Sequence, residues 1–301
     1  MIGTEAPAPD AARMVGEFLA AKLRDLDGAL QDAGQRVLQG GRGFRRSPQA
    51  PRIGADPAVH DLRVVLRRMR TLLEVSQDVF GRFRVDEVRR ALRHVHRATG
   101  AVRDEEVLIA LVESLGLAEP KTATWLEARR RRERRLRTAL RRIVRAGEID
   151  RAHVLLSALL AFRVNPAKDK RLTKFARRAV DSAKTAAERI EQPAIDDAEA
   201  LHRLRIACKR LRYTAEAFVE GLPDDHAALA SLAARLQRRL GDLRDVDVAI
   251  DVVLKARVLA DRAPVLAALG RVRAVRAEAY TKAVSGTQAE GADSLRKIST
   301  R

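Results

Sequence analysis

The chain of 301 residues carries a formal net charge of +19 at pH 7, because 59 Lys and Arg residues outnumber 40 Asp and Glu residues. A charge of this size attracts polyanions and repels cations, so nucleic acid, anionic membrane surfaces and chains of inorganic phosphate are all eligible partners. The single cysteine, Cys208, excludes an internal disulfide framework and a cysteine-based zinc site. It lies on the apolar side of its predicted helix, and we interpret it as a small core residue.

The start of the chain and its hydropathy bear on where the protein acts. Residues Met1 to Ala12 lack the apolar run of a signal peptide. No uncharged stretch approaches the ~20 residues that a membrane-spanning helix requires. We therefore expect a cytoplasmic protein with no membrane span.

Apolar residues recur at helical spacing along almost the whole chain, and no stretch alternates as a strand would. Ala, Leu, Val and Arg dominate the composition, which favours helix throughout. Asp56 is placed to cap one helix, with Pro57 in the first turn of that helix. The predicted helices are Ala11 to Leu38, Pro57 to Phe80, Asp86 to Leu115, Glu119 to Arg145, Lys168 to Ile190, Ala194 to Glu220, Asp225 to Leu259 and Arg262 to Val284.

The segments between these helices divide the chain into two halves. Gly40 to Ala55 contains several glycine and proline residues and is predicted to be a basic loop. Residues 147–166 hold a short apolar stretch, which we interpret as a connector between the halves. Residues 285–301 are polar without an apolar period, and we expect a disordered tail. The halves, 11–146 and 167–284, then hold about four long helices each, as helical bundles do.

One predicted helix in each half carries a row of basic residues. Positions i, i+3, i+7, i+10 and i+14 of a helix fall within a sector of roughly 80°, and such positions usually hold apolar core residues. The second half has His202, Arg205, Lys209, Arg212 and Glu216 there, and the first half has His60, Arg63, Arg67, Arg70 and Glu74. Each residue of the first set lies 142 positions before its counterpart.

A second match follows each row. The segment Gly100–Asp104 corresponds to Gly241–Asp245 at an offset of 141. Two matches in the same order, at nearly the same offset, indicate a tandem duplication. We therefore predict an all-α fold of two helical bundles that are related by a pseudo-twofold axis.

A row of cations along a helix can follow a chain of phosphates, because i, i+3 and i+7 advance by about 4.5 and 6 Å along the axis. Arginine makes bidentate contacts with phosphate oxygens, and a histidine in the row becomes charged more readily beside a phosphate. The alternative is that both rows are solvated faces, paired with Glu74, Glu216 and other acids. Their repetition at the same positions favours binding.

Three other groups of residues allow two interpretations each. The pairs Arg103-Asp104 and Arg244-Asp245 either hold helix against helix as ion pairs, or use the carboxylate to orient a phosphate-binding arginine. The run from Arg129 to Arg142 is either a solvated face or an extension of the anion-binding surface. His94 and His96 diverge on a helix, so they make poor metal partners and are expected to be exposed or interfacial.

The motif H-x-x-R-x-x-x-[RK]-R-x-R occurs once in each half and precedes the segments Gly100–Asp104 and Gly241–Asp245. This pattern resembles the CHAD family of helical domains, over roughly Ala11 to Val284. The resemblance implies two pseudo-twofold-related bundles whose basic residues line a central groove or pore that binds inorganic polyphosphate, and association with polyphosphate or storage granules. The residues that match the family's binding motif are His60, Arg63, Arg67, Arg70, His202, Arg205, Lys209 and Arg212.

The function classes that remain are binding proteins. Some CHAD relatives are fused to a triphosphate-tunnel enzyme that begins with E-x-E-x-K, but no such motif lies near Met1, so the chain resembles the stand-alone form. With no Gly-rich phosphate loop, H-E-x-x-H motif or catalytic triad order, we expect no enzyme, no cofactor and no metal site. The same charge could bind nucleic acid non-specifically, but aromatic residues that stack on bases are only 3% of the chain. Inorganic polyphosphate is therefore the favoured partner, and nucleic acid is the alternative.

Overall fold

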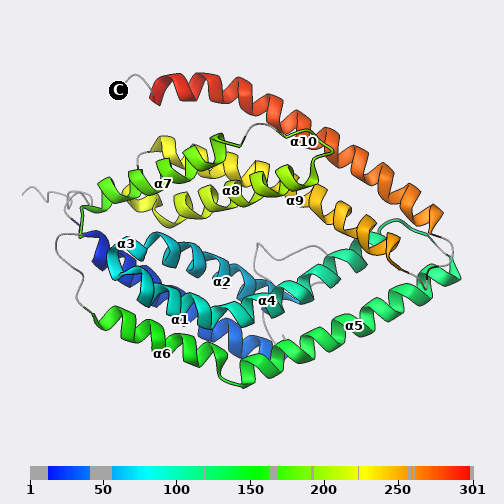
Figure 1. Ribbon diagram of the computed structural model, residues 1–301, viewed down its shortest axis with the longest axis horizontal. Helices are drawn as coiled ribbons and strands as arrows, with labels where there is room; N and C mark the ends of the chain where they lie inside the picture. Colours follow the sequence, from blue (N-terminus) through cyan, green and yellow to red (C-terminus); the bar gives the residue numbers. More distant parts are fainter. Residues whose placement is uncertain are drawn as a thin grey trace, which may run out of the picture. The chain divides into compact units, whose positions relative to one another are not determined.

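The computed structural model describes residues 13–40, 56–117, 119–162, 169–190, 193–222, 224–256, 259 and 262–298. Within these ranges the protein is helical, with no strand beyond an isolated bridge between Met14 and Arg171 (Figure 1). The prediction of an all-α fold is therefore confirmed. The basic loop predicted at Gly40 to Ala55 lies outside the described residues, except for Gly40, whose left-handed backbone (φ 74°) ends the first helix.

The helices follow the predicted order, with bounds that shift by a few residues in several places and with three larger differences. They are α1 (Val15–Gln39), α2 (Pro57–Val75), α3 (Gln77–Phe80), α4 (Arg82–Glu113), α5 (Pro120–Arg145), α6 (Glu148–Ala161), α7 (Leu172–Glu188), α8 (Ala198–Ala217), the 3-10 turn η1 (Val219–Gly221), α9 (Asp224–Leu254) and α10 (Ala263–Ile298). The helix predicted to end at Phe80 divides at Ser76 into α2 and α3. The predicted connector contains α6, and α10 continues to Ile298, past the predicted end at residue 284.

The helix bounds repeat at the spacing of the sequence repeat. A shift of 142 residues takes α2 (57–75) to 199–217, within one residue of α8. The same shift takes the start of α3 to the start of η1, and the start of α4 to the start of α9. A shift of 141 takes the end of α4 to the end of α9. This correspondence is what a duplicated sequence would produce.

The described residues form two compact units, each assembled from several stretches of the chain. The first unit draws on residues 1–106, 132–182 and 213–226, and the second on residues 107–131, 183–212 and 227–301. The prediction of one bundle in 11–146 and one in 167–284 stays a prediction. Of the two basic rows, the one on α2 belongs to the first unit and the one on α8 belongs to the second.

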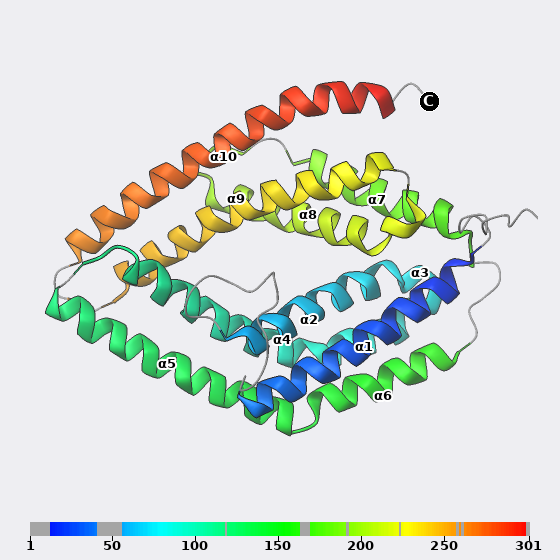
Figure 2. The ribbon, with the colours of Figure 1, turned by 180° about the vertical axis from the view of Figure 1, so that it is seen from behind.

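The core of the first unit joins α1, α2, α6 and the beginning of α4 (Figures 1 and 2). Phe18 and Phe218 are fully buried in this core and stack with ring centroids 5.7 Å apart. The stretch predicted as a connector is part of this core, because Ile149, Ala152, Leu156 and Leu159 are buried at helical spacing. The helix α6 begins after Gly147, whose positive φ of 80° allows a sharp turn out of α5.

The second unit has two apolar clusters among the described residues. One joins the end of α4 and the start of α5 to α9 and α10, around Trp125. The other packs Leu201 and Cys208 of α8 against α9 and against Tyr280 of α10. Cys208 is a core residue, as predicted, and burial raises the pKa of its thiol to about 11. A thiol with this pKa is almost entirely protonated at neutral pH and is a poor nucleophile.

Candidate functional site

The row on α2 is held at the surface of the first unit by the burial of the opposite side of the helix. Asp56 caps α2 by accepting a hydrogen bond of 2.9 Å from the backbone N–H of Ala58. Four apolar side chains on the inner side are buried, namely Leu62, Leu66, Met69 and Leu73. The row residues His60, Arg63, Arg67 and Arg70 are all half-buried, whereas Arg68, which lies outside the row, is exposed.

The row on α8 has the same construction within the second unit. Asp197 accepts a hydrogen bond of 2.8 Å from the backbone N–H of Ala200, at the start of the helix. Leu201, Cys208 and Leu211 are buried. The row residues His202, Arg205, Lys209 and Arg212 are half-buried, and Arg210 outside the row is exposed. Both rows are therefore partly removed from water, unlike ordinary solvated faces.

Each histidine of the rows lies close to an arginine from a different helix. Burial lowers the pKa of His60, and the nearby Arg103, Arg67 and Arg63 lower it further, against an opposing contribution from Asp61. Burial likewise lowers the pKa of His202, followed by Arg244, Arg205 and Lys209. Arg103 and Arg244 belong to the two repeated segments that follow the rows. Each segment thus brings one more cation toward the histidine of its own unit.

The structure shows which carboxylate contacts Arg103, the arginine of the first Arg-Asp pair. Arg103 pairs with Glu106, at 3.4 Å, and not with its neighbour Asp104, which is exposed. The carboxylate that orients Arg103 is therefore Glu106, one helical turn away from Asp104, which the sequence suggested.

The Nδ1 atom of His202 is buried and has no hydrogen-bond partner among the described residues. A buried polar atom of this kind is costly unless a ligand or water satisfies it.

Three arginines of the α2 row are positioned by neighbours in the first unit. Arg67 donates a hydrogen bond of 2.7 Å to the hydroxyl of Tyr213, and its guanidinium lies 5.6 Å from the centre of that ring. Arg70 donates to the imidazole of His96 at 3.1 Å. Arg63 lies against Gly100, where a Cβ atom would be 3.1 Å from a guanidinium nitrogen. Such contacts reduce the rotamer freedom that a long side chain would lose on binding.

Sequence reasoning missed Tyr213 and His96 as partners of the row. Tyr213 directly follows the second motif, but the equivalent position in the first motif is Thr71, so the repeat did not mark it. His96 was expected to be exposed or interfacial, and it is half-buried beside Arg70. The proximity of Tyr213 to the sequence motif was the one available signal.

The arginine run on α5 is not a uniform solvated face. Arg137 points inward and donates to the buried carboxylates of Asp56 and Glu106, at 2.9 Å each, and also to Glu133. Burial raises the pKa of Glu106, whereas its hydrogen bond from the backbone of Asp56 and the charge of Arg137 oppose that rise. This network fixes α5 and α4 to the beginning of α2, where the row starts.

The second unit has a comparable junction. Arg273 of α10 donates to Asp247 at 2.7 Å and to the backbone carbonyl of Ile195 at 3.0 Å. Asp247 lies 141 residues after Glu106, and Ile195 lies three residues before the start of α8. In both units an arginine therefore joins the carboxylate that follows the repeated segment to the start of the helix that carries the row.

No group of three or more His, Cys, Asp and Glu side chains among the described residues is arranged to hold a metal ion. No helix in this part of the chain is both long enough and apolar enough to cross a bilayer.

The fold and the rows together define an all-helical protein with repeated, partly buried basic surfaces. The chain belongs to the CHAD domain family, whose sequence model matches residues 42–254. Uncharacterized proteins from two strains of Mycobacterium tuberculosis are each 31% identical to it over 231 residues. That match covers 71% of this chain but only 43% of the relatives, so the chain spans less than half of their length.

Solved structures share the fold at lower sequence identity. The CHAD domain from the plant Ricinus communis superposes with a TM-score of 0.64 at 21% identity, covering 96% of this chain and 91% of that one. PptA from Streptomyces chartreusis superposes with a TM-score of 0.62 at 18% identity, covering 92% of this chain and 98% of that one. At these identities the likeness concerns the fold alone.

Proposed function

We propose that the protein binds inorganic polyphosphate through the basic rows of α2 and α8. The observation that carries this proposal is the half-burial of four cationic or titratable residues at equivalent positions of each helix, with a further arginine beside each histidine. Membership of the CHAD family supports it, since the resemblance of the motifs implies polyphosphate as the ligand.

The physical properties of the rows suit a linear polyanion. Their cations are spaced by about 4.5 to 6 Å along the helix, so successive phosphates can meet successive side chains. Half-burial lowers the effective dielectric constant around each charge, which strengthens its attraction to a phosphate. Hydrogen bonds from Arg67 and Arg70 to neighbouring side chains hold these cations in place before the ligand arrives.

The proposal also covers how the two basic rows arose and whether they act together. We infer that they arose by tandem duplication, because the helix bounds repeat at the offset of the sequence repeat. That both rows serve one central groove or pore follows from the family resemblance and stays a prediction. Binding rather than catalysis, a cytoplasmic location and association with polyphosphate or storage granules are parts of the same proposal.

A competition titration tests this function against the nucleic-acid alternative. The full chain is titrated with long-chain polyphosphate, single-stranded DNA and double-stranded DNA at one fixed salt concentration, because counterion release makes affinities at different salt incomparable. We expect polyphosphate to bind at least about tenfold more tightly per phosphate than either DNA, since aromatic residues that could stack on bases are only 3% of the chain. Equal or tighter binding of DNA would overturn the proposal.

A further inference from the structure

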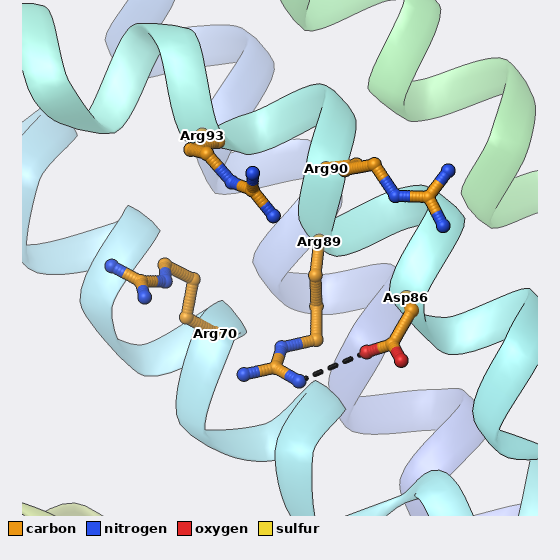
Figure 3. A pocket seen from close by; sticks show the side chains of 5 residues that line it. All are labelled: Arg70, Asp86, Arg89, Arg90 and Arg93. Atoms are coloured by element: carbon orange, nitrogen blue, oxygen red, sulfur yellow. Dashed lines mark hydrogen bonds and ion pairs between the residues drawn. The ribbon is translucent and has the colours of Figure 1, made fainter.

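A pocket of about 230 Å³ lies between α2 and α4 in the first unit. It is lined by Arg70 of α2 and by Asp86, Arg89, Arg90 and Arg93 of α4 (Figure 3). Typical pockets for drug-sized molecules have volumes of roughly 300–1,000 Å³. The pocket therefore suits a more compact ligand, and its four guanidinium groups select a negatively charged one.

The charges in the pocket are only partly neutralised by the protein. Asp86 accepts from Arg89 at 3.0 Å, as Figure 3 shows, and Arg90 pairs with Glu87 outside the pocket lining. Arg70 and Arg93 form no ion pair within the part of the chain that the structure describes. Burial lowers the pKa of Arg70, and the neighbouring Arg89 and Arg93 add to this effect against Glu74. A bound anion would relieve this accumulation of positive charge.

The position of the pocket links it to the α2 row. Arg70 is the last basic residue of that row and also lines the pocket. A phosphate chain that follows the row from His60 would therefore reach the pocket after Arg70. The three remaining arginines come from α4, outside the repeated motif. The pocket thus adds a cluster of cations at one end of a linear array.

We propose that this pocket binds the terminal phosphate of a linear phosphate chain, an inference that rests on the proposed function. A terminal phosphate has three free oxygens and a second ionisation near pH 6, so it carries up to two negative charges at neutral pH. An interior phosphate has two free oxygens and carries a single charge. Several guanidinium groups around one pocket, each able to bind phosphate oxygens in pairs, favour the more highly charged end over the interior.

The test compares linear tripolyphosphate, which has two ends, with cyclic trimetaphosphate, which has none. Binding to the full chain is measured by calorimetry at one pH and ionic strength, with orthophosphate as a competitor. Arg93→Gln removes one of the two pocket cations that form no ion pair among the described residues. Arg135→Gln is a matched control, because Arg135 is exposed on α5 and its substitution makes the same change in net charge. Circular dichroism and thermal melting verify that both variants fold.

We expect Arg93→Gln to weaken the binding of tripolyphosphate about tenfold and to change the affinity for trimetaphosphate by less than twofold. Arg135→Gln should change both ligands by less than twofold, and orthophosphate should compete only weakly. Equal losses for the linear and cyclic ligands in Arg93→Gln would overturn the end-binding proposal. Orthophosphate that competes as well as tripolyphosphate would also overturn it, because the pocket would then be a site for free phosphate.

Long-chain polyphosphate separates failure of this inference from failure of the proposed function. If long chains bind tightly and the linear preference is absent, the end-binding proposal is wrong and the proposed function stands. If tripolyphosphate binds in an Arg93-dependent manner and long chains do not bind, both are wrong, because the pocket would then accept only small oxyanions. Tight binding of long chains together with an Arg93-dependent linear preference supports both.

Discussion

Arg67 of α2 and Tyr213 of α8 are joined by a hydrogen bond of 2.7 Å, in which the guanidinium donates to a phenolic hydroxyl on a ring that is 5% exposed. Arg67 occupies the middle of the α2 row, so Tyr213 positions a residue that we expect to contact polyphosphate. The tyrosine also supplies an aromatic face to the same guanidinium. Its role can be separated from that of a core side chain, because the hydroxyl and the ring can be removed independently.

The first prediction concerns this hydroxyl. Tyr213→Phe keeps the ring but removes the acceptor, so Arg67 loses its fixed orientation, and we expect polyphosphate affinity to fall about three- to tenfold. A lysine at position 67 cannot be held by Tyr213 in the geometry of the arginine. In the Arg67→Lys background, Tyr213→Phe should therefore cause almost no further loss of polyphosphate affinity. A double-mutant cycle by calorimetry measures this coupling. Additive losses would show that Tyr213 acts only through the stability of the core.

The second prediction separates position from charge. Reversing the central residues of both rows, Arg67→Glu with Lys209→Glu, removes charge-assisted hydrogen bonds and adds repulsion, so affinity should fall by about two orders of magnitude or more. The control is Arg68→Glu with Arg210→Glu, which makes the same charge change at exposed positions of the same helices. We expect a loss of less than about tenfold there, mainly in association rate. Similar losses in both double variants would leave only a diffuse basic surface.

The third prediction follows from the lowered pKa values of His60 and His202. Because both pKa values are lowered from the ordinary 6.5, the imidazoles are mostly neutral at pH 7 in the free protein, and we expect a bound polyanion to raise these pKa values. Binding therefore takes up protons, so affinity should increase as pH falls from about 7 through 6.5, the ordinary pKa of histidine. The slope is at most about tenfold per pH unit for each histidine.

Terminal phosphates titrate near pH 6 themselves. Long-chain polyphosphate is the appropriate ligand for this measurement, because it has few terminal phosphates relative to its length. The double variant His60→Asn with His202→Asn should give a nearly flat profile over the same range at constant ionic strength. A profile that keeps its slope in the double variant would assign the pH dependence to other groups.

The lowered pKa values of His60 and His202 also predict that the unliganded protein loses stability as pH falls below 6.5, since unfolding allows the histidines to become protonated.

The fourth prediction concerns the junction at Arg137. Arg137→Met removes the cation that pairs with Asp56 and Glu106, whose side chains are only 8% and 5% exposed. Removing the charged partner of a buried ion pair destabilises a protein by about 3–5 kcal/mol, and Glu106 would keep only the longer pair with Arg103, at 3.4 Å. We expect a loss of this size in the free energy of unfolding, measured by urea denaturation. Arg135→Met on the exposed side of α5 should change it by about 0.5 kcal/mol or less, and equal effects would contradict the structural role of Arg137.

The fifth prediction concerns catalysis. The purified protein should release no orthophosphate from polyphosphate or from nucleotides, with or without Mg²⁺ or Mn²⁺. A colorimetric phosphate assay over several hours checks this expectation. Turnover that survives purification and disappears on substitution of a single row residue would show that the protein is an enzyme.

The rows and the fold class could be predicted because both depend on local periodicity. A helix places i, i+3 and i+7 on one side wherever it occurs, so the half-buried row from His60 to Arg70 follows once α2 forms. The division of the predicted helix at Ser76 was missed, because no glycine or proline marks it. The helix α6 was missed because a short apolar stretch does not reveal whether it connects two bundles or packs into one.

The partners of the rows could not be predicted, because they depend on contacts between distant segments. Tyr213 lies 146 residues from Arg67, and no local pattern relates two positions so far apart. The same holds for Arg137 and Asp56, which are 81 residues apart. The sequence left the α5 run open between a solvated face and an extension of the anion-binding surface, because its arginines fall on several sides of a helix. Only tertiary structure distinguishes the inward Arg137 from the exposed Arg135.

Gly100 has a consequence for how this protein could be engineered. Glycine inside a helix costs roughly 1 kcal/mol relative to alanine, so a stability screen would favour Gly100→Ala. The added methyl group would lie 3.1 Å from the Arg63 guanidinium and would force that cation to move. At Gly100 the stability of the helix therefore competes with the position of Arg63, which we propose binds polyphosphate. We expect a variant selected for heat resistance alone to bind polyphosphate more weakly, without any change in its charge.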